Sequence, residues 1–119
     1  MPLQRVAHVN LSVDDVPVAE HFYGTVLGLE RAPRPADSAR QGAWFQLGGF
    51  ELHISFEAGA RNADSKRHVA FEVDGLLALR ERLAASGVAI DDGRPATGVT
   101  RFFVRDPAGN RLEFFERIS

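Results

Sequence analysis

Three histidines and one glutamate lie where their side chains could bind a metal ion. His8 and His68 are separated by 60 residues, and so are His53 and Glu113. All four lie in stretches where apolar and polar residues alternate, which indicates β-strands whose successive side chains point to opposite faces. With the apolar side chains in a core, these four point away from it. A histidine on the polar face of a strand is often only solvated, but imidazole and carboxylate groups with this shared spacing favour a site for Mn, Fe, Co, Ni or Zn.

The interval of 60 residues runs through nearly the whole chain. Identical residues recur at this interval, and the pairs include His8/His68, Val9/Val69, Val13/Val73, Asp14/Asp74, Gly49/Gly109 and Leu52/Leu112. We interpret residues 1–119 as a single domain made of module 1 (1–57) and module 2 (67–119), joined by a polar linker. A module of this size is marginal alone. If the modules pack about a pseudo-twofold axis, the four candidate ligands can converge on one point.

Periodicity predicts the same β-α-β-β-β order in each module. Module 1 is expected to have a strand at 4–13, a helix capped by Asp14 or Asp15 and ended by Gly28, a poorly marked second strand, and strands at 42–48 and 50–57. Module 2 is expected to have a strand at 67–73, a helix capped by Asp74 and ended by Gly87, a short strand at 88–91, and strands at 99–105 and 111–117. The segment DPAGN (106–110) is typical of a turn between the last two strands.

Composition narrows the functional classes. The chain has 119 residues, 45% of them hydrophobic and 25% charged, which is typical of a folded globular protein. A formal net charge of −2 argues against nucleic acid as a partner. The absence of an apolar run of roughly 20 residues argues against a membrane-spanning segment. With no cysteine, the chain cannot form disulfides or thiolate ligands, and we expect a cytoplasmic location.

Two further groups of polar residues lie on the same strand faces as the candidate ligands. Arg101 and Arg105 share one face of the strand at 99–105 and could hold an anionic substrate, although a solvated surface is the more common role of such residues. Glu51 and Glu72 share the face of the candidate ligands. Either could transfer protons, and simple exposure is the alternative.

Aromatic residues of module 1 and one further histidine have less specific roles. Tyr23 falls on the apolar stripe of the helix and is expected in the core. Trp44 and Phe45 are expected in the core as well, with a ring that faces the substrate as the alternative. His21 lies off the apolar stripe of the same helix, so we assign it no role and treat it as a control.

The order of several segments resembles the vicinal oxygen chelate superfamily. The segments are RVAHVNLSVDD, FYGTVLGLE, ELHIS, RHVAFEVDG and FFVRDPAGNRLEFFE, which together cover nearly the whole chain. That superfamily includes glyoxalase I, fosfomycin-modifying enzymes, bleomycin-resistance proteins and extradiol dioxygenases. The resemblance implies an α+β glyoxalase-like fold, in which two paired β-α-β-β-β modules form a curled mixed sheet around a cleft. It also implies that His8, His68 and Glu113 bind the metal and that His53 occupies the fourth ligand position.

The resemblance further implies a metal-dependent enzyme that acts on a small oxygen-chelating substrate. A glyoxalase-like lyase or isomerase, with Glu113 as the catalytic residue, is the leading hypothesis. The alternatives are a fosfomycin-type thiol transferase, a ring-cleaving dioxygenase and a metal-free protein that sequesters a small molecule. His53 departs from the pattern, because bacterial glyoxalase I-like enzymes carry Glu there and fosfomycin-modifying thiol transferases carry no ligand.

A homodimer is the expected assembly. In small bacterial members that this chain resembles, two chains commonly exchange modules and form two identical clefts. His8 and His53 of one chain would then meet His68 and Glu113 of the other. The linker of about 11 residues between 57 and 67 reaches roughly 35 Å when extended, which permits this arrangement or a site within one chain.

Overall fold

Each half of the chain folds as a unit that begins with a strand, continues with a helix and ends with a hairpin of two strands. The computed structural model describes residues 2–36, 41–60 and 62–118. Contacts divide the chain into unit 1, residues 1–61, and unit 2, residues 62–119. Both units combine one mixed sheet with helix, so the predicted α+β class is confirmed. None of the described helices is long and apolar enough to cross a membrane.

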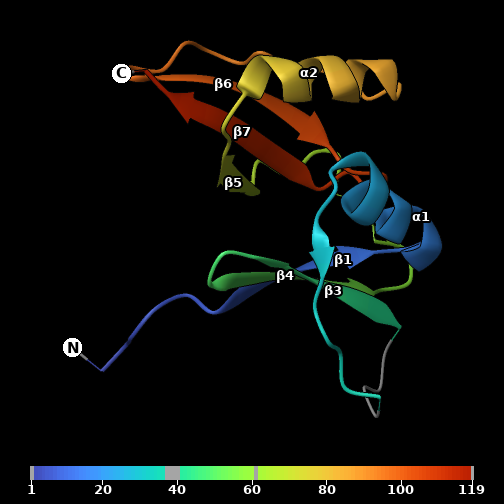
Figure 1. Cartoon of the computed structure of the whole chain (residues 1–119). Coiled ribbons are helices and arrows are strands. Elements are labelled where there is room, and N and C mark those ends of the chain that lie inside the picture. Colours follow the sequence, from blue (N-terminus) through green and yellow to red (C-terminus); the bar gives the residue numbers. More distant parts are fainter. Residues whose placement is uncertain (1, 37–40, 61, 119) are drawn as a thin grey trace. The chain divides into compact units, whose positions relative to one another are not determined.

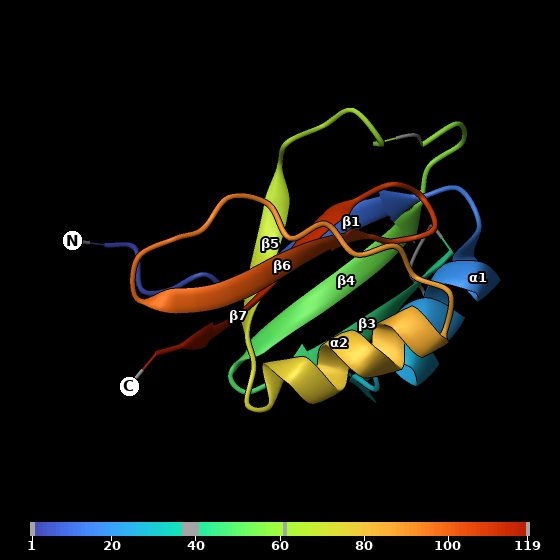
Figure 2. The ribbon, with the colours of Figure 1, turned by 90° about the horizontal axis from the view of Figure 1, so that it is seen from above.

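Unit 1 contains a sheet of four strands and a helical segment. Its elements are β1 (His8–Val13), α1 (Val16–His21), the π-helix η1 (Phe22–Val26), β2 (Glu30–Arg31), β3 (Gly42–Leu47) and β4 (Phe50–Phe56). The strand order is β1-β4-β3-β2. The strands β1 and β4 run parallel, whereas β3 is antiparallel to both of its neighbours (Figure 2). Because β1 and β4 are adjacent, residues 43 positions apart in sequence are register partners.

The helix of unit 1 begins where the sequence indicates. Asp15 is extended, and its carboxylate accepts a hydrogen bond from the backbone N–H of Val18 at 3.1 Å. After His21 the helix widens into a π-turn, in which the N–H of Leu27 donates to the carbonyl of Phe22 at 2.9 Å. Phe22 and Tyr23 are both buried. The predicted apolar stripe is therefore confirmed for these residues, although the last turn is wider than an α-helix.

Unit 2 repeats this arrangement with one strand fewer. Its elements are β5 (His68–Glu72), α2 (Leu76–Ala85), β6 (Val99–Arg105) and β7 (Arg111–Arg117), with the strand order β5-β7-β6 (Figure 1). The short strand predicted at 88–91 is wrong, because only an isolated bridge between Asp91 and Phe103 forms there. Gly93 follows at a φ of 63°, a left-handed conformation that favours glycine.

The start of α2 also differs from the prediction. Gly75, not Asp74, is the N-cap residue, and its φ of 83° is left-handed. The carboxylate of Glu116 on β7 accepts hydrogen bonds from the N–H groups of Gly75 at 3.0 Å and Leu76 at 3.1 Å. These two bonds hold the pKa of Glu116 below its ordinary value. A residue distant in sequence thus caps the helix, which local patterns could not indicate.

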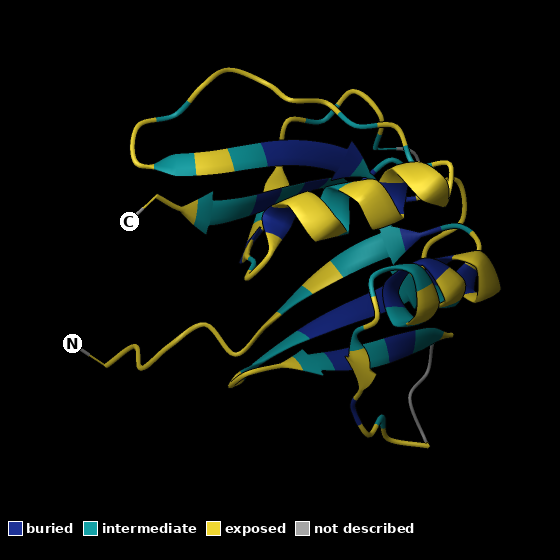
Figure 3. Cartoon of the chain, turned by 45° about the horizontal axis from the view of Figure 1, so that its top comes forward, coloured by how far each residue is buried: buried dark blue, intermediate teal, exposed yellow. Residues whose placement is uncertain are grey.

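One face of each sheet supplies the core of its unit. In unit 1 the buried strand residues include Phe45, Leu52 and Ile54, and α1 contacts both β3 and β4. In unit 2, Leu112 and Phe114 are buried on β7, which α2 contacts. Figure 3 shows α2 largely exposed on its outer side, while buried residues run along the strands. Buried residues alternate along β3 and β7, in agreement with the predicted strand faces. Three consecutive residues are buried in β4 and in β6, so the face opposite the core is partly covered there.

The DPAGN turn joins β6 and β7 and holds the start of unit 2. The buried carboxylate of Asp106 accepts hydrogen bonds from the N–H of Ala108 at 2.9 Å and from that of Asn110 at 2.8 Å. One nitrogen of Arg105 donates to the carbonyls of residues 62, 65 and 109 at 2.9–3.1 Å. Arg105 thus fixes residues 62–65 on the turn.

Candidate functional site

Three rings stack on the face of the unit 1 sheet that lies opposite its core. The ring of His53 on β4 lies 3.9 Å from that of Trp44 on β3, with an interplanar angle of 1°. The ring of His8 on β1 lies 4.1 Å from His53 on its other side, at 16°. We call Trp44, His53 and His8 the ring stack. The stack leaves His53 only 7% exposed, although it lies on the polar face of its strand.

Glu51 contacts the ring stack from the same strand. Its Oε1 lies 2.8 Å from Nε2 of His53, two residues further along β4. Residues two apart in a strand project from one face, so the sequence predicted that Glu51 and His53 share this face. It did not predict the contact between their side chains. The contact occupies one ring nitrogen of His53 and fixes the orientation of the ring.

Unit 2 brings the other two candidate ligands together. Nε2 of His68 on β5 lies 3.1 Å from Oε1 of Glu113 on β7. The other ring nitrogen, Nδ1, lies 3.0 Å from the backbone carbonyl of Lys66. A carbonyl oxygen only accepts hydrogen bonds, so Nδ1 is the donor and carries a proton. The other ring nitrogen, Nε2, is thereby directed at the carboxylate of Glu113.

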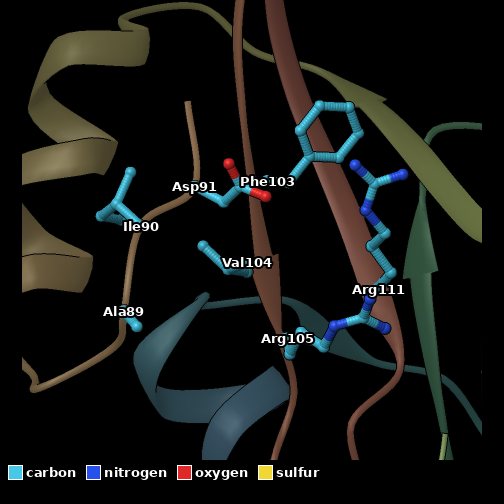
Figure 4. Close-up of a pocket in the computed structure, with 7 residues that line it drawn as sticks. All are labelled: Ala89, Ile90, Asp91, Phe103, Val104, Arg105 and Arg111. Atoms are coloured by element: carbon cyan, nitrogen blue, oxygen red, sulfur yellow. The ribbon is translucent and has the colours of Figure 1, made fainter. Parts of the chain in front are cut away.

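A groove of about 580 Å³ surrounds His68 and Glu113 on unit 2. The buried ring of Phe103 lines it, and the edge of His68 meets that ring at a centroid distance of 5.7 Å. We call this the cationic groove, because five basic side chains line it, which are Lys66, Arg94, Arg101, Arg105 and Arg111. A smaller cavity of about 190 Å³ adjoins it between β6 and the segment at 89–91 (Figure 4).

The structure thus brings the predicted ligands together in pairs, His8 with His53 and His68 with Glu113. Among residues 2–36, 41–60 and 62–118, no group of three or more histidine or acidic side chains is arranged to hold a metal ion. Convergence of the two pairs on one ion stays a prediction. His21 is exposed in the last turn of α1, which suits its use as a control.

The structure also places the other residues that the sequence analysis identified as candidates. Phe45 is buried in the core, as predicted, whereas Trp44 lies in the ring stack and not in the core. Arg105 supports the turn, as described above, whereas Arg101 lies beside Glu113, with 3.9 Å between Nη1 and Oε2. Glu72 pairs with Arg117 at 3.3 Å. The sequence analysis did not identify Arg111 as a candidate, because only the fold shows that its side chain lies over the Phe103 ring.

Comparisons with known proteins define the class. The model of the glyoxalase, bleomycin resistance protein and dioxygenase superfamily matches residues 5–114. The chain belongs to this superfamily, the vicinal oxygen chelate group. No curated protein matches the chain significantly.

Solved structures share the fold over nearly their full lengths. A glyoxalase family protein from Bacillus anthracis is 34% identical, with a TM-score of 0.87 over 98% of this chain and 97% of the other. Lactoylglutathione lyase from Agrobacterium tumefaciens is 26% identical, with a TM-score of 0.76 over 97% and 95%. FosX, a fosfomycin resistance protein from Listeria monocytogenes, was crystallised with Mn(II) and a dihydroxypropylphosphonic acid. It is 18% identical with a TM-score of 0.85 over 98% and 94%, a likeness of fold alone.

Proposed function

We propose that this protein is a metal-dependent enzyme, a glyoxalase-like lyase or isomerase that acts on a small oxygen-chelating substrate. The observation that carries the proposal is the paired orientation of His68 and Glu113. Metal-binding histidines commonly donate their second ring N–H to a carbonyl or carboxylate, which directs the free nitrogen at the metal. The bond from Nδ1 of His68 to the Lys66 carbonyl has this form, and Nε2 faces Glu113 at 3.1 Å.

The donor set fits a divalent ion of intermediate softness. We expect His8, His53, His68 and Glu113 to hold it, and imidazole with carboxylate suits Ni, Mn, Fe, Co or Zn. FosX, crystallised with Mn(II), supports a metal in this fold. His53 would keep its Nε2 contact with Glu51 and offer Nδ1, in the manner of a histidine oriented by a carboxylate.

We expect the residues of the site to have different roles in the reaction. When bound, the metal would act as a Lewis acid that stabilises negative charge on substrate oxygens. Glu113 would move a proton between carbon atoms, because its side chain is 12% exposed and adjoins both His68 and Arg101. Trp44 and Phe103 would provide flat apolar surfaces beside the ligands of each unit. Lactoylglutathione lyase among the structural relatives supports this reaction class.

We also propose a cytoplasmic homodimer in which each metal site takes His8 and His53 from one chain and His68 and Glu113 from the other. The linker constrains this exchange. The N–H of Glu57 bonds to the carbonyl of Val13 in unit 1, and Asn62 bonds to the turn of unit 2. Only residues 58–61 therefore lie between the two attachments, and the five intervals from residue 57 to residue 62 span about 17 Å when fully extended. A longer reach would require residues 62–65 to leave the turn.

Metal analysis and one assay test the proposed function. The protein is purified without added metal, and its content of divalent ions is measured. It is then stripped, reloaded with Ni, Mn, Fe, Co or Zn in turn, and assayed for isomerisation of a hemithioacetal. We expect about one ion per chain and activity that depends on the ion. A protein that binds no ion under these conditions would contradict the proposal and favour a small-molecule-sequestering role.

A further inference from the structure

We propose that Arg111 and Arg101 form an oxyanion-binding subsite in the cationic groove, so that the substrate carries a carboxylate or a phosphate-like group. This inference names the substrate class of the enzyme proposed above, and it rests on that function. The metal ligands alone do not require an anionic substrate. The charge and the geometry of unit 2 point to one.

Arg111 is held flat and has its donors available. Its guanidinium carbon lies 3.7 Å from the centroid of the Phe103 ring, and Phe103 is only 4% exposed (Figure 4). Stacking on a buried ring limits the rotamers of the side chain and leaves the N–H groups at its edge. Among the described residues, no group accepts a hydrogen bond or forms an ion pair with this guanidinium.

Arg101 lies on the same ring and is anchored by backbone. Its guanidinium carbon lies 5.2 Å from the Phe103 centroid, while Nε and Nη2 donate to the carbonyl of Arg94 at 3.3 and 3.0 Å. Nη1 remains, and Oε2 of Glu113 lies 3.9 Å from it, beyond hydrogen-bond distance. Arg101 therefore keeps one nitrogen without a hydrogen-bond acceptor among the described contacts, and it lines the same groove as Arg111.

Basic side chains outnumber carboxylates in the cationic groove. Five basic side chains line it, against the carboxylates of Asp91 and Glu113, although the whole chain has a net charge of −2. Asp91 is already occupied, since its Oδ1 accepts from the N–H of Gly93 at 2.9 Å. Other arginines have carboxylate partners, as Arg31 has Glu20 and Arg117 has Glu72. A focused positive potential of this kind raises the local concentration of anions.

The geometry of a stacked guanidinium suits planar or tetrahedral oxyanions. Two parallel N–H groups at the edge of Arg111 can bond two oxygens of a carboxylate, a phosphonate or a phosphate. An amide or hydroxyl group would accept fewer hydrogen bonds from the edge of Arg111 and would not neutralise its charge. The substrate is therefore expected to present its chelating oxygens to the metal ligands and an anionic group to Arg111.

Anion titration of the metal-free protein tests this subsite. Inorganic phosphate, methylphosphonate and acetate are titrated in low-chloride buffer, with acetamide as the neutral match of acetate, and the shifts of the arginine Nε–Hε signals are followed by NMR. We expect the three anions to shift the Arg111 signal and acetamide to leave it unchanged. Binding of phosphate and methylphosphonate without acetate would specify a tetrahedral anion, and binding of all three would admit carboxylate.

Variants identify the residue responsible. Arg111→Gln should weaken anion binding by roughly tenfold, because it removes a charged pair of donors, and Arg111→Lys should weaken it less. The matched control is Arg117→Gln, since Arg117 lies on the same strand and over another ring, Phe115, yet outside the groove. Circular dichroism confirms that each variant is folded.

The outcomes separate this inference from the proposed function. If Arg111→Gln binds anions as well as the unmodified protein, or Arg117→Gln weakens them equally, the subsite is wrong even when the metal binds. If anions bind at Arg111 and no metal binds, the enzyme assignment fails instead. A folded Arg111→Lys protein that binds anions more weakly than Arg111→Gln would also contradict the subsite, because lysine keeps the positive charge.

Discussion

The two units place an aromatic ring opposite the same position of their last strands. Trp44 is the register partner of His53, and Phe103 is that of Glu113. In unit 1 the partner ring stacks directly on the candidate ligand, which is 7% exposed. In unit 2 the ring instead supports arginines, and the carboxylate contacts His68 at 3.1 Å.

This difference shows what a repeated backbone determines and what it leaves free. The parallel pairs β1/β4 and β5/β7 set the positions of the candidate ligands in the same way. The side chains around them then create a ring stack in one unit and a cationic groove in the other. In the proposed site, unit 1 would contribute stacked imidazole groups, while unit 2 would contribute Glu113 and the basic side chains of the cationic groove.

Removal of a ligand should give the largest effect. His68→Ala or Glu113→Ala is expected to abolish most metal binding, because each removes half of the pair in unit 2. His53→Ala should only weaken it, since Glu51 lies 2.8 Å from His53 and can partly replace it. Metal content after gel filtration measures both effects. His21→Ala is the control, and full occupancy in His68→Ala would contradict the assignment.

Strand faces and the repeat could be predicted from the sequence because they depend on local alternation. That reasoning placed His8, His53, His68 and Glu113 on the strand faces opposite the core. The structure brings His8 together with His53 in unit 1 and His68 together with Glu113 in unit 2. Strand bounds at β6 and β7 were predicted to the residue.

Features that depend on distant residues were missed. The predicted Asp74 cap is replaced by Glu116, which reaches Gly75 across 41 positions of the chain. The expected strand at 88–91 fails because one bridge to Phe103 precedes the turn at Gly93. Stacking of Arg111 on Phe103 is likewise a consequence of register between β6 and β7.

Subunit exchange tests whether a metal site takes its ligands from both units of one chain or from two different chains. His8→Ala and Glu113→Ala proteins are mixed under conditions in which subunits exchange. For a site shared between chains, one cleft of the mixed dimer has both substitutions and the other has neither, so part of the metal binding should return. A mixture that exchanges subunits and recovers no metal, or a monomer at micromolar concentration, would place all four ligands in one chain.

The ring beneath each site should differ in its contribution to stability. Phe103→Ala removes a buried ring and should lower the free energy of unfolding by about 3 kcal/mol. Trp44→Ala removes a partly exposed ring, and we expect about 1–2 kcal/mol. Urea unfolding measures both, with Leu47→Ala as the control because Leu47 is 46% exposed. Equal losses of unfolding free energy in Phe103→Ala and Trp44→Ala would contradict this difference between the units.

The two helix caps provide the smallest and most specific test. Asp15 caps α1 from its own segment, whereas Glu116 caps α2 from β7. Hydrogen bonds from Gly75 and Leu76 lower the pKa of Glu116 from its ordinary 4.5, so the folded state favours the ionised form. The resulting stability is fully present above about pH 4.5 and is lost as the pH falls through the lower pKa of the folded protein.

Glu116→Gln should therefore lower the melting temperature by a few degrees at pH 7, because the amide keeps one acceptor and loses the charge. The deficit should shrink as the pH falls below about 4.5 and through the lowered pKa of Glu116, where the carboxyl of the unmodified protein becomes protonated. Thermal unfolding followed by circular dichroism at several pH values measures this convergence. Glu81→Gln is the matched control, since Glu81 lies exposed on the same helix and should give parallel curves. A constant difference between Glu116→Gln and the unmodified protein at every pH would show that the cap acts through shape and not through charge.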